Sequence, residues 1–312
     1  MKTQTFGWQH ILIQVPIDWH MIFEKESRKR QKKETGYFGF RDSKEKKLEI
    51  SYAKIEKKPP DINKVIEDYF KSLKKSHKKI GIKNEGPKKI SGHDARYIYW
   101  DLEKEGLQGY IVAWNCQSTQ RLVICTAQFE KVKKSTEKSG IMEIISLINC
   151  HPESTFSIWS APNLQIHTPY LRMRLKKKNF LIGLTFLHLG NDDLDFLAYR
   201  IGLANQKITS DDKIPSWFQK FYKKNLPGIP SNYNPEEFTK LIYKKKTITW
   251  KCVQLEERKF SLKFARKYHE TYLWSNPDKN DIYCIIYSMK RSPLAKTRDI
   301  IEKMTKLAIG GN

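Results

Sequence analysis

Residues 90–126 read ISGHDARYIYWDLEKEGLQGYIVAWNCQSTQRLVICT, and this stretch decides the fold. In three segments within it, residues 96–100, 110–114 and 122–125, successive side chains fall into two alternating sets. A period of two is typical of β-strands with one buried face. Because Gly106 separates the first two segments and marks a turn, the stretch predicts three successive antiparallel strands.

The chain on either side of this stretch predicts further strands and two helices. Short strands are expected at residues 11–15, 19–23, 37–41 and 48–55. Asp61 is expected to cap a helix, because its carboxylate can accept hydrogen bonds from the first free backbone N–H groups. Apolar side chains recur at helical spacing from Ile62 to Leu73, and again over residues 141–148.

The second half of the chain repeats this order of elements. In blocks without gaps, Pro16 aligns with Pro162 and Trp114 with Trp274. The separation between aligned residues only grows along the chain, as insertions in surface loops of a second copy would produce. These matches favour a tandem duplication, although two unrelated antiparallel domains would also align in part.

The combined pattern predicts an α+β fold with two similar domains, over residues 1–152 and 153–312. Each domain is expected to be an α/β sandwich, in which helices flank one antiparallel sheet. In the second domain, strands are expected at residues 170–175, 180–189 and 194–203, with the lysines that follow residue 175 in a turn.

The order of strands and helices resembles one known family. Together with the Val15, Pro16 and Trp19 pattern near the start, it is similar to the PsbP-like α/β sandwich, which also occurs in a Ran-binding nuclear import factor. The resemblance covers each half of the chain once and implies a fold whose relatives mostly bind and scaffold and do not catalyse. No residue matches a functional residue of that family, so the resemblance implies a fold and no site.

The chain is strongly basic, with a formal net charge of +24 and a pI near 9.7. Such a charge favours acidic macromolecules as partners, nucleic acid among them. The residues expected to contact such a partner are Arg28, Lys29, Arg30, Lys32, Lys33, Lys176, Lys177, Lys178, Lys244, Lys245 and Lys246. If these runs do not share a face, each is only a solvated lysine cluster.

The five cysteines form no CxxC pair, which indicates buried thiols in a reducing compartment. The N-terminal residues lack an apolar segment of signal-peptide length, and no stretch approaches the length of a membrane span. We therefore expect a cytoplasmic protein without a transmembrane segment.

One group of residues could support catalysis. Cys116 follows a strand, and His93 and Asp94 lie upstream, so neighbouring strands could assemble a thiol, a base and an orienting carboxylate. The spacing is unspecific, and a structural histidine beside a buried thiol is the simpler interpretation.

Metal and cofactor sites are not expected. The eight histidines include no HxH or HExxH pattern, and no phosphate-binding glycine loop occurs. The sequence leaves open one alternative, a metal-binding cluster that only tertiary contacts would assemble, such as His151 and His167 near Cys150.

The sequence therefore favours a non-enzymatic binding or scaffold protein with a basic surface for an acidic partner. The alternative is a thiol-dependent hydrolase that uses Cys116 and His93.

Overall fold

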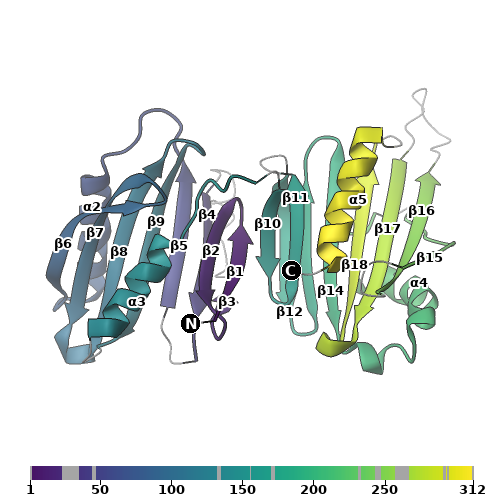
Figure 1. The fold of residues 1–312 in the computed structure, drawn as a ribbon, viewed down its shortest axis with the longest axis horizontal. Coiled ribbons are helices and arrows are strands. Elements are labelled where there is room, and N and C mark those ends of the chain that lie inside the picture. The colour runs from purple at the N-terminus through teal and green to yellow at the C-terminus, as the bar shows by residue number, and fades with distance from the viewer. Residues whose placement is uncertain are drawn as a thin grey trace. The chain divides into compact units, whose positions relative to one another are not determined.

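The computed structural model describes residues 2–22, 35–43, 47–131, 135–154, 156–169, 173–230, 233–242, 247–256, 267–290, 293 and 295–310. The chain divides into two compact units, Met1–Glu153 and Ser154–Asn312. Over the described residues, each unit contains one seven-stranded antiparallel sheet, one two-stranded hairpin and two α-helices (Figure 1).

The first unit is built from nine strands and two helices in its described part. In sheet order the strands are β3 (His20–Ile22), β4 (Thr35–Arg41), β5 (Lys47–Lys54), β9 (Arg121–Glu130), β8 (Leu107–Cys116), β7 (His93–Leu102) and β6 (Gly81–Ile90). The remaining elements are the hairpin strands β1 (Thr3–Trp8) and β2 (Ile11–Pro16) and the helices α2 (Ile62–Ser76) and α3 (Ser135–Ser146). The three strands predicted from residues 90–126 are confirmed as β7, β8 and β9.

The register between β7 and β8 decides which side chains share a face of this sheet. Ile98 pairs with Ile111, and both pack in one core cluster with Ile66 of α2. Ala95 pairs with Trp114, and these two side chains point to the opposite face because side chains alternate along a strand. Figure 1 shows α2 behind the sheet and α3 in front of it, so a helix covers each face.

The helix α2 follows directly from its sequence. Its apolar positions recur at helical spacing, and Ile66 is buried against the sheet. The backbone N–H of Asn63 donates a hydrogen bond to the carboxylate of Asp61 at 2.9 Å. The predicted N-cap is therefore confirmed.

The second unit has the same order of elements. In sheet order the strands are β12 (Arg174–Leu181), β13 (Leu184–Gly190), β14 (Leu194–Gly202), β18 (Asp281–Met289), β17 (Lys267–Asn276), β16 (Ile248–Glu256) and β15 (Thr239–Ile242). The other elements are β10 (Phe156–Ala161), β11 (Leu164–Pro169), α4 (Ile214–Asn225) and α5 (Ala295–Gly310). Short 3-10 helices cover Glu103–Glu105, Ala204–Gln206, Asp211–Lys213 and Pro277–Lys279. The shared strand order supports the proposal of a tandem duplication.

The predicted α+β class is wrong, because the protein consists mostly of sheet with few helices. The sequence pattern missed β1, β6, β15 and β16. The strand β6 illustrates the reason: it forms the edge of its sheet and is exposed at most positions, so it carries no alternating apolar signal.

The prediction that three lysines of the second unit lie in a turn is wrong, because they lie in a strand. Lys176, Lys177 and Lys178 belong to β12, and the turn falls at Ile182 and Gly183 instead. Because β12 is an edge strand, lysines are compatible with it and protect its open backbone from pairing with other chains.

A buried histidine at the first hairpin makes the stability of the first unit depend on pH. Gln9 and His10 both have positive φ and form the two-residue turn between β1 and β2. Burial, with a smaller contribution from the positive charge of Arg121, lowers the pKa of His10 from 6.5 to about 4. As the pH falls below 6.5, the imidazole of His10 is therefore protonated in the unfolded chain before it is protonated in the folded state. The folded state loses stability over this range, until the pH reaches about 4.

We expect His10→Asn to remove this pH dependence, since asparagine tolerates the left-handed backbone and does not titrate. Between about pH 7 and pH 4, the wild-type protein should lose roughly 2–3 kcal/mol more stability than the variant. Urea unfolding of both proteins at several pH values measures this difference. Equal losses in the two proteins would show that His10 does not cause the pH dependence.

Candidate metal centre

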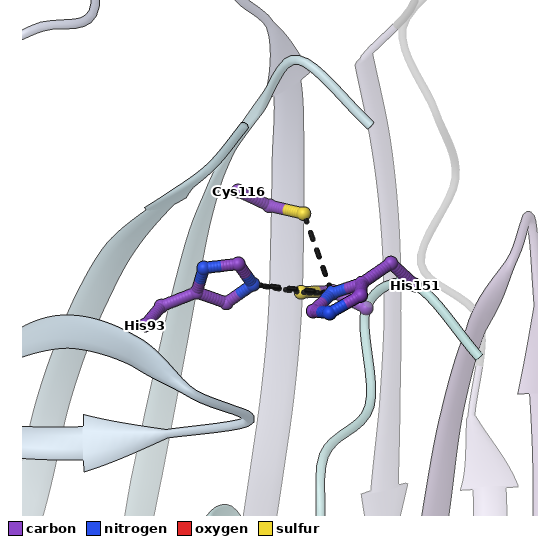
Figure 2. Close-up of side chains that lie close together, drawn as sticks. His93, Cys116 and His151 are labelled. Carbon is purple, nitrogen blue, oxygen red and sulfur yellow. Dashed lines mark hydrogen bonds between the residues drawn. The ribbon is translucent and has the colours of Figure 1, made fainter. Parts of the chain in front are cut away.

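Two histidines and two cysteines meet at one end of the sheet in the first unit. They are His93, Cys116, Cys150 and His151, and their ligand atoms all lie within 4.8 Å of one another. Figure 2 shows this cluster, with His93, Cys116 and His151 labelled. The four residues come from three places in the sequence. Each place is fixed by a separate element of the fold.

Strand pairing brings the first two residues together. His93 is the first residue of β7 and follows the tight turn at Ser91 and Gly92, both with positive φ. Cys116 is the last residue of β8, which runs antiparallel to β7. Because Ala95 pairs with Trp114, His93 and Cys116 project from the same end and the same face of the sheet.

The segment after α3 delivers the other two residues. Backbone hydrogen bonds in both directions, each 2.8 Å long, join Leu12 of β2 to Asn149. The hydroxyl of Ser91 donates to the carbonyl oxygen of Ile148. These contacts fix Cys150 and His151 beside the end of β7 and β8.

The distances within the cluster are short. The His93 Nε2 atom lies 3.1 Å from His151 Nδ1 and 3.3 Å from Cys150 Sγ. The His151 Nδ1 atom lies 3.4 Å from Cys150 Sγ and 3.7 Å from Cys116 Sγ. One nitrogen of each imidazole and both sulfurs therefore point to a common centre.

Both sulfurs are shielded from solvent, whereas the two imidazoles are half-buried. The indole N–H of Trp114 donates to Cys150 Sγ at 3.4 Å. A hydrogen bond between the thiols lowers the pKa of Cys116 and raises the pKa of Cys150. Thiol and imidazole donors of this kind can hold a transition-metal ion.

The catalytic alternative is only partly assembled. His93 and Cys116 belong to the same cluster, but the sulfur of Cys116 contacts His151. The side chain of Asp94 is 91% exposed and forms an ion pair of 2.5 Å with Lys89. Because neighbouring residues of a strand point to opposite faces, Asp94 is directed away from the thiol and the imidazole.

Sequence reasoning predicted no metal site and left open a cluster of His151 and His167 near Cys150. The structure places His151 beside Cys150 and puts His167 on β11 of the second unit. The sequence held one signal that could have indicated the cluster. A Cys-His pair follows a predicted helix directly, and a histidine and a cysteine stand at the ends of adjacent predicted strands.

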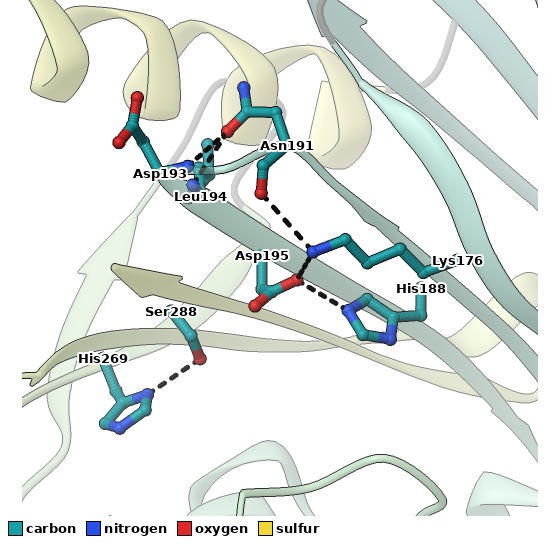
Figure 3. A network of polar contacts seen from close by, with 8 residues as sticks. All are labelled: Lys176, His188, Asn191, Asp193, Leu194, Asp195, His269 and Ser288. Carbon is teal, nitrogen blue, oxygen red and sulfur yellow. Dashed lines mark hydrogen bonds and ion pairs between the residues drawn. The ribbon is translucent and has the colours of Figure 1, made fainter. Parts of the chain in front are cut away.

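The predicted basic residues fall into two groups. Arg28, Lys29, Arg30, Lys32, Lys33, Lys244, Lys245 and Lys246 lie outside the described residues. Of the lysines on β12, Lys177 is exposed and Lys178 half-buried. Lys176 takes part in a polar network with Asp195, at a distance of 2.7 Å (Figure 3).

In this network the exposed side chain of Lys176 is paired with an acidic side chain of the same unit. His188 Nε2 also lies 2.8 Å from Asp195, and Lys176 donates to the backbone carbonyl of Asn191 at 3.4 Å. Burial alone would raise the pKa of Asp195, but the hydrogen bonds of His188 and Lys176 outweigh it and lower the pKa to about 2. The lysine is therefore a structural ion-pair partner in this unit.

No protein family and no curated protein matches the chain. Among solved structures, the apo immunity protein TplEi of T6SS from Pseudomonas aeruginosa is 9% identical with a TM-score of 0.32, covering 97% of this chain and 95% of that chain. The Tle4-Tli4 complex is 7% identical with a TM-score of 0.33, covering 97% and 96%. Similarity of this size carries no argument about fold or function, and the PsbP-like resemblance stays a prediction.

In the part of the chain that the structure describes, no helix is both long and apolar enough to cross a membrane.

Proposed function

We propose that this chain is a non-enzymatic binding protein that recognises an acidic protein partner through lysines of its first unit. The observation that carries the proposal is a group of exposed lysines at the end of α2 and in the turns beside it. We call this group the α2 lysine surface; it consists of Lys74, Lys75, Lys78, Lys79 and Lys104. Within the described residues, none of the five forms an ion pair.

One acidic side chain near this surface is already paired with a lysine outside it, since Glu103 lies 3.1 Å from Lys83. Glu105 lies 3.6 Å from His77, which is an ion pair only when the imidazole is protonated. Glu103 is therefore less available to neutralise the lysines of the α2 lysine surface. The surface retains positive charge that an acidic partner can neutralise.

Two of the lysines are close enough to affect each other. A side-chain hydrogen bond with Lys104 lowers the pKa of Lys79. Two ammonium groups this close also repel each other, and a carboxylate bound between them would relieve that repulsion. Crowded like charges of this kind favour an anionic ligand.

Two features favour a protein over nucleic acid as the partner. No arginine, which is the usual residue for planar, bidentate contacts to phosphate, occurs in α2, in the turn after it or in Glu103–Glu105. The α2 lysine surface also lies beside the edge strand β6, whose outer backbone groups can pair with a strand of another protein.

Anisotropy of labelled poly-L-glutamate, used as an acidic polypeptide probe, tests the proposal. Neutralising Lys74, Lys75, Lys78 and Lys79 together with glutamine should weaken binding about tenfold at low salt. The matched control replaces exposed lysines of the equivalent helix region in the second unit, which changes the net charge equally. These control residues are Lys213, Lys220, Lys223 and Lys224.

The control variant should bind poly-L-glutamate within about twofold of the wild-type protein. Equal losses in the two variants would mean that bulk charge alone attracts the probe, and the proposal would fail. A labelled DNA duplex is measured in parallel at about 50 and 200 mM salt. Tighter binding of the duplex through the same lysines would assign the surface to nucleic acid and overturn the choice of partner.

A further inference from the structure

The cluster of His93, Cys116, Cys150 and His151 has the dimensions of a tetrahedral zinc site. With ordinary zinc bond lengths, a tetrahedron separates two nitrogens by about 3.3 Å and a nitrogen and a sulfur by about 3.6 Å. The nitrogens in the cluster are 3.1 Å apart, and three of the four nitrogen–sulfur distances are 3.3, 3.4 and 3.7 Å. No two ligand atoms are more than 4.8 Å apart, so a zinc ion at the centre requires the most widely spaced ligand atoms to move inward by up to about 1 Å.

We propose that these four residues bind one zinc ion in a closed structural site of the first unit. The ligand atoms are Nε2 of His93, Nδ1 of His151 and the sulfurs of Cys116 and Cys150. Two thiolates with two imidazoles suit zinc, whereas magnesium and calcium prefer oxygen ligands. Because the protein supplies all four ligands, no position is open for a substrate, and the role of the ion is structural.

The surroundings of the cluster fit a metal centre. The indole N–H of Trp114 points at Cys150 Sγ, which is the kind of outer hydrogen bond that orients a metal-bound thiolate. Both sulfurs are buried, so they are protected from solvent and from other thiols. The two imidazoles are half-buried, so their side of the cluster is partly exposed to solvent.

Zinc at this position would join three separate parts of the first unit. His93 and Cys116 end two neighbouring strands, and Cys150 and His151 lie just before the boundary of the unit at Glu153. The ion would fasten the last segment of the unit to its sheet. This function is independent of the proposed partner surface.

The second unit provides an internal comparison. Its strand β17 ends at Asn276, which corresponds to Cys116 at the end of β8. Asn276 accepts a hydrogen bond from the backbone N–H of Lys279 and caps a short helix. Over the described residues, only the first unit contains such a cluster.

Metal analysis of the full-length protein, purified with reductant and without chelator, tests the site. Elemental mass spectrometry should find about one zinc per chain, and C116A or C150A should retain less than about one tenth of it. The matched control is C125A, which removes another buried thiol of the same sheet and should keep the zinc. Retention of stoichiometric zinc by C116A and C150A would overturn the assignment.

Two further measurements do not depend on how well the alanine variants fold. Apo protein loaded with cobalt should show the visible bands of a tetrahedral ion and a near-ultraviolet thiolate-to-cobalt band. The variant H93C should still bind zinc, and its cobalt form should show a stronger thiolate band from the third sulfur. Reduced apo protein that takes up neither metal would contradict the proposal, as would a Cys116–Cys150 disulfide that persists under reductant.

Discussion

Removing zinc from the full-length protein with a chelator should lower the thermal midpoint of the first unit by roughly 10 °C. A ligand that binds only the folded state stabilises it by about 4 kcal/mol when its free concentration exceeds Kd a thousandfold. The second unit should unfold at the same temperature in both conditions, since the described cluster lies in the first unit. Calorimetry measures both transitions.

The assignment of each transition needs a local probe. Hydrogen exchange of peptides from β7 and β8 reports the first unit, and peptides from β17 and β18 report the second. In C150A, the first unit should unfold at the lower temperature whether or not chelator is present. If chelation leaves the first unit unchanged, or lowers both units equally, the structural role of zinc is contradicted.

A second large effect is expected at a buried carboxylate of the second unit. Glu270 on β17 is almost fully buried and lies 2.5 Å from the ammonium group of Lys251. It also accepts hydrogen bonds from the hydroxyls of Tyr268 at 3.1 Å and Tyr272 at 2.5 Å. Three polar groups therefore depend on one side chain.

We expect Glu270→Ala to destabilise the second unit by about 3–5 kcal/mol, because it leaves a half-buried ammonium group and two hydroxyls without this acceptor. Such a loss is a large part of the stability of a typical domain. The free energy of unfolding from urea titration measures it. Burial, reinforced by the neighbouring Glu270, raises the pKa of Tyr268, so this hydroxyl stays a donor throughout the neutral range.

Two control variants distinguish the effect of losing the buried ion pair on stability from the effect of losing a surface charge. Glu302→Ala removes an exposed carboxylate that pairs with Lys306 on α5, and it should cost less than about 1 kcal/mol. The double variant K251M/E270L removes both charges and should recover part of the lost stability, the remainder being the cost of two buried tyrosine hydroxyls without this acceptor. If E270A is as stable as the wild-type protein, the buried pair has no structural role.

The sequence predicts elements well where burial leaves a pattern. The strands β7, β8 and β9 are central in their sheet, and their alternating side chains separate one face from the other. The helix α2 has both an apolar stripe and an Asp61 cap. Each of these signals lies within a few residues of sequence, so one sequence is sufficient to find them.

The edge strand β6 was missed, and β12 was predicted only in part, for the opposite reason. The strands β6 and β12 are exposed over much of their length and carry lysines, which resembles a loop in sequence. Their strand conformation depends on hydrogen bonds to β7 and β13, which are long-range contacts. These missed strand residues are a main reason why a mostly sheet protein was assigned to the α+β class.

The candidate metal centre could be predicted only in part. Antiparallel pairing of β7 and β8 implies that His93 and Cys116 meet at one end of the sheet. No local pattern shows that the chain after α3 returns to this end and brings Cys150 and His151 there. That return depends on the pairing of Leu12 with Asn149, which are far apart in sequence.

The most direct test of the zinc site is X-ray absorption at the zinc edge of the loaded full-length protein. A zinc ion held by Cys116, Cys150, His93 and His151 should have two sulfur neighbours at about 2.3 Å and two nitrogen neighbours at about 2.0 Å. A first shell of only oxygen and nitrogen would contradict this assignment, because neither Cys116 nor Cys150 would then bind the metal.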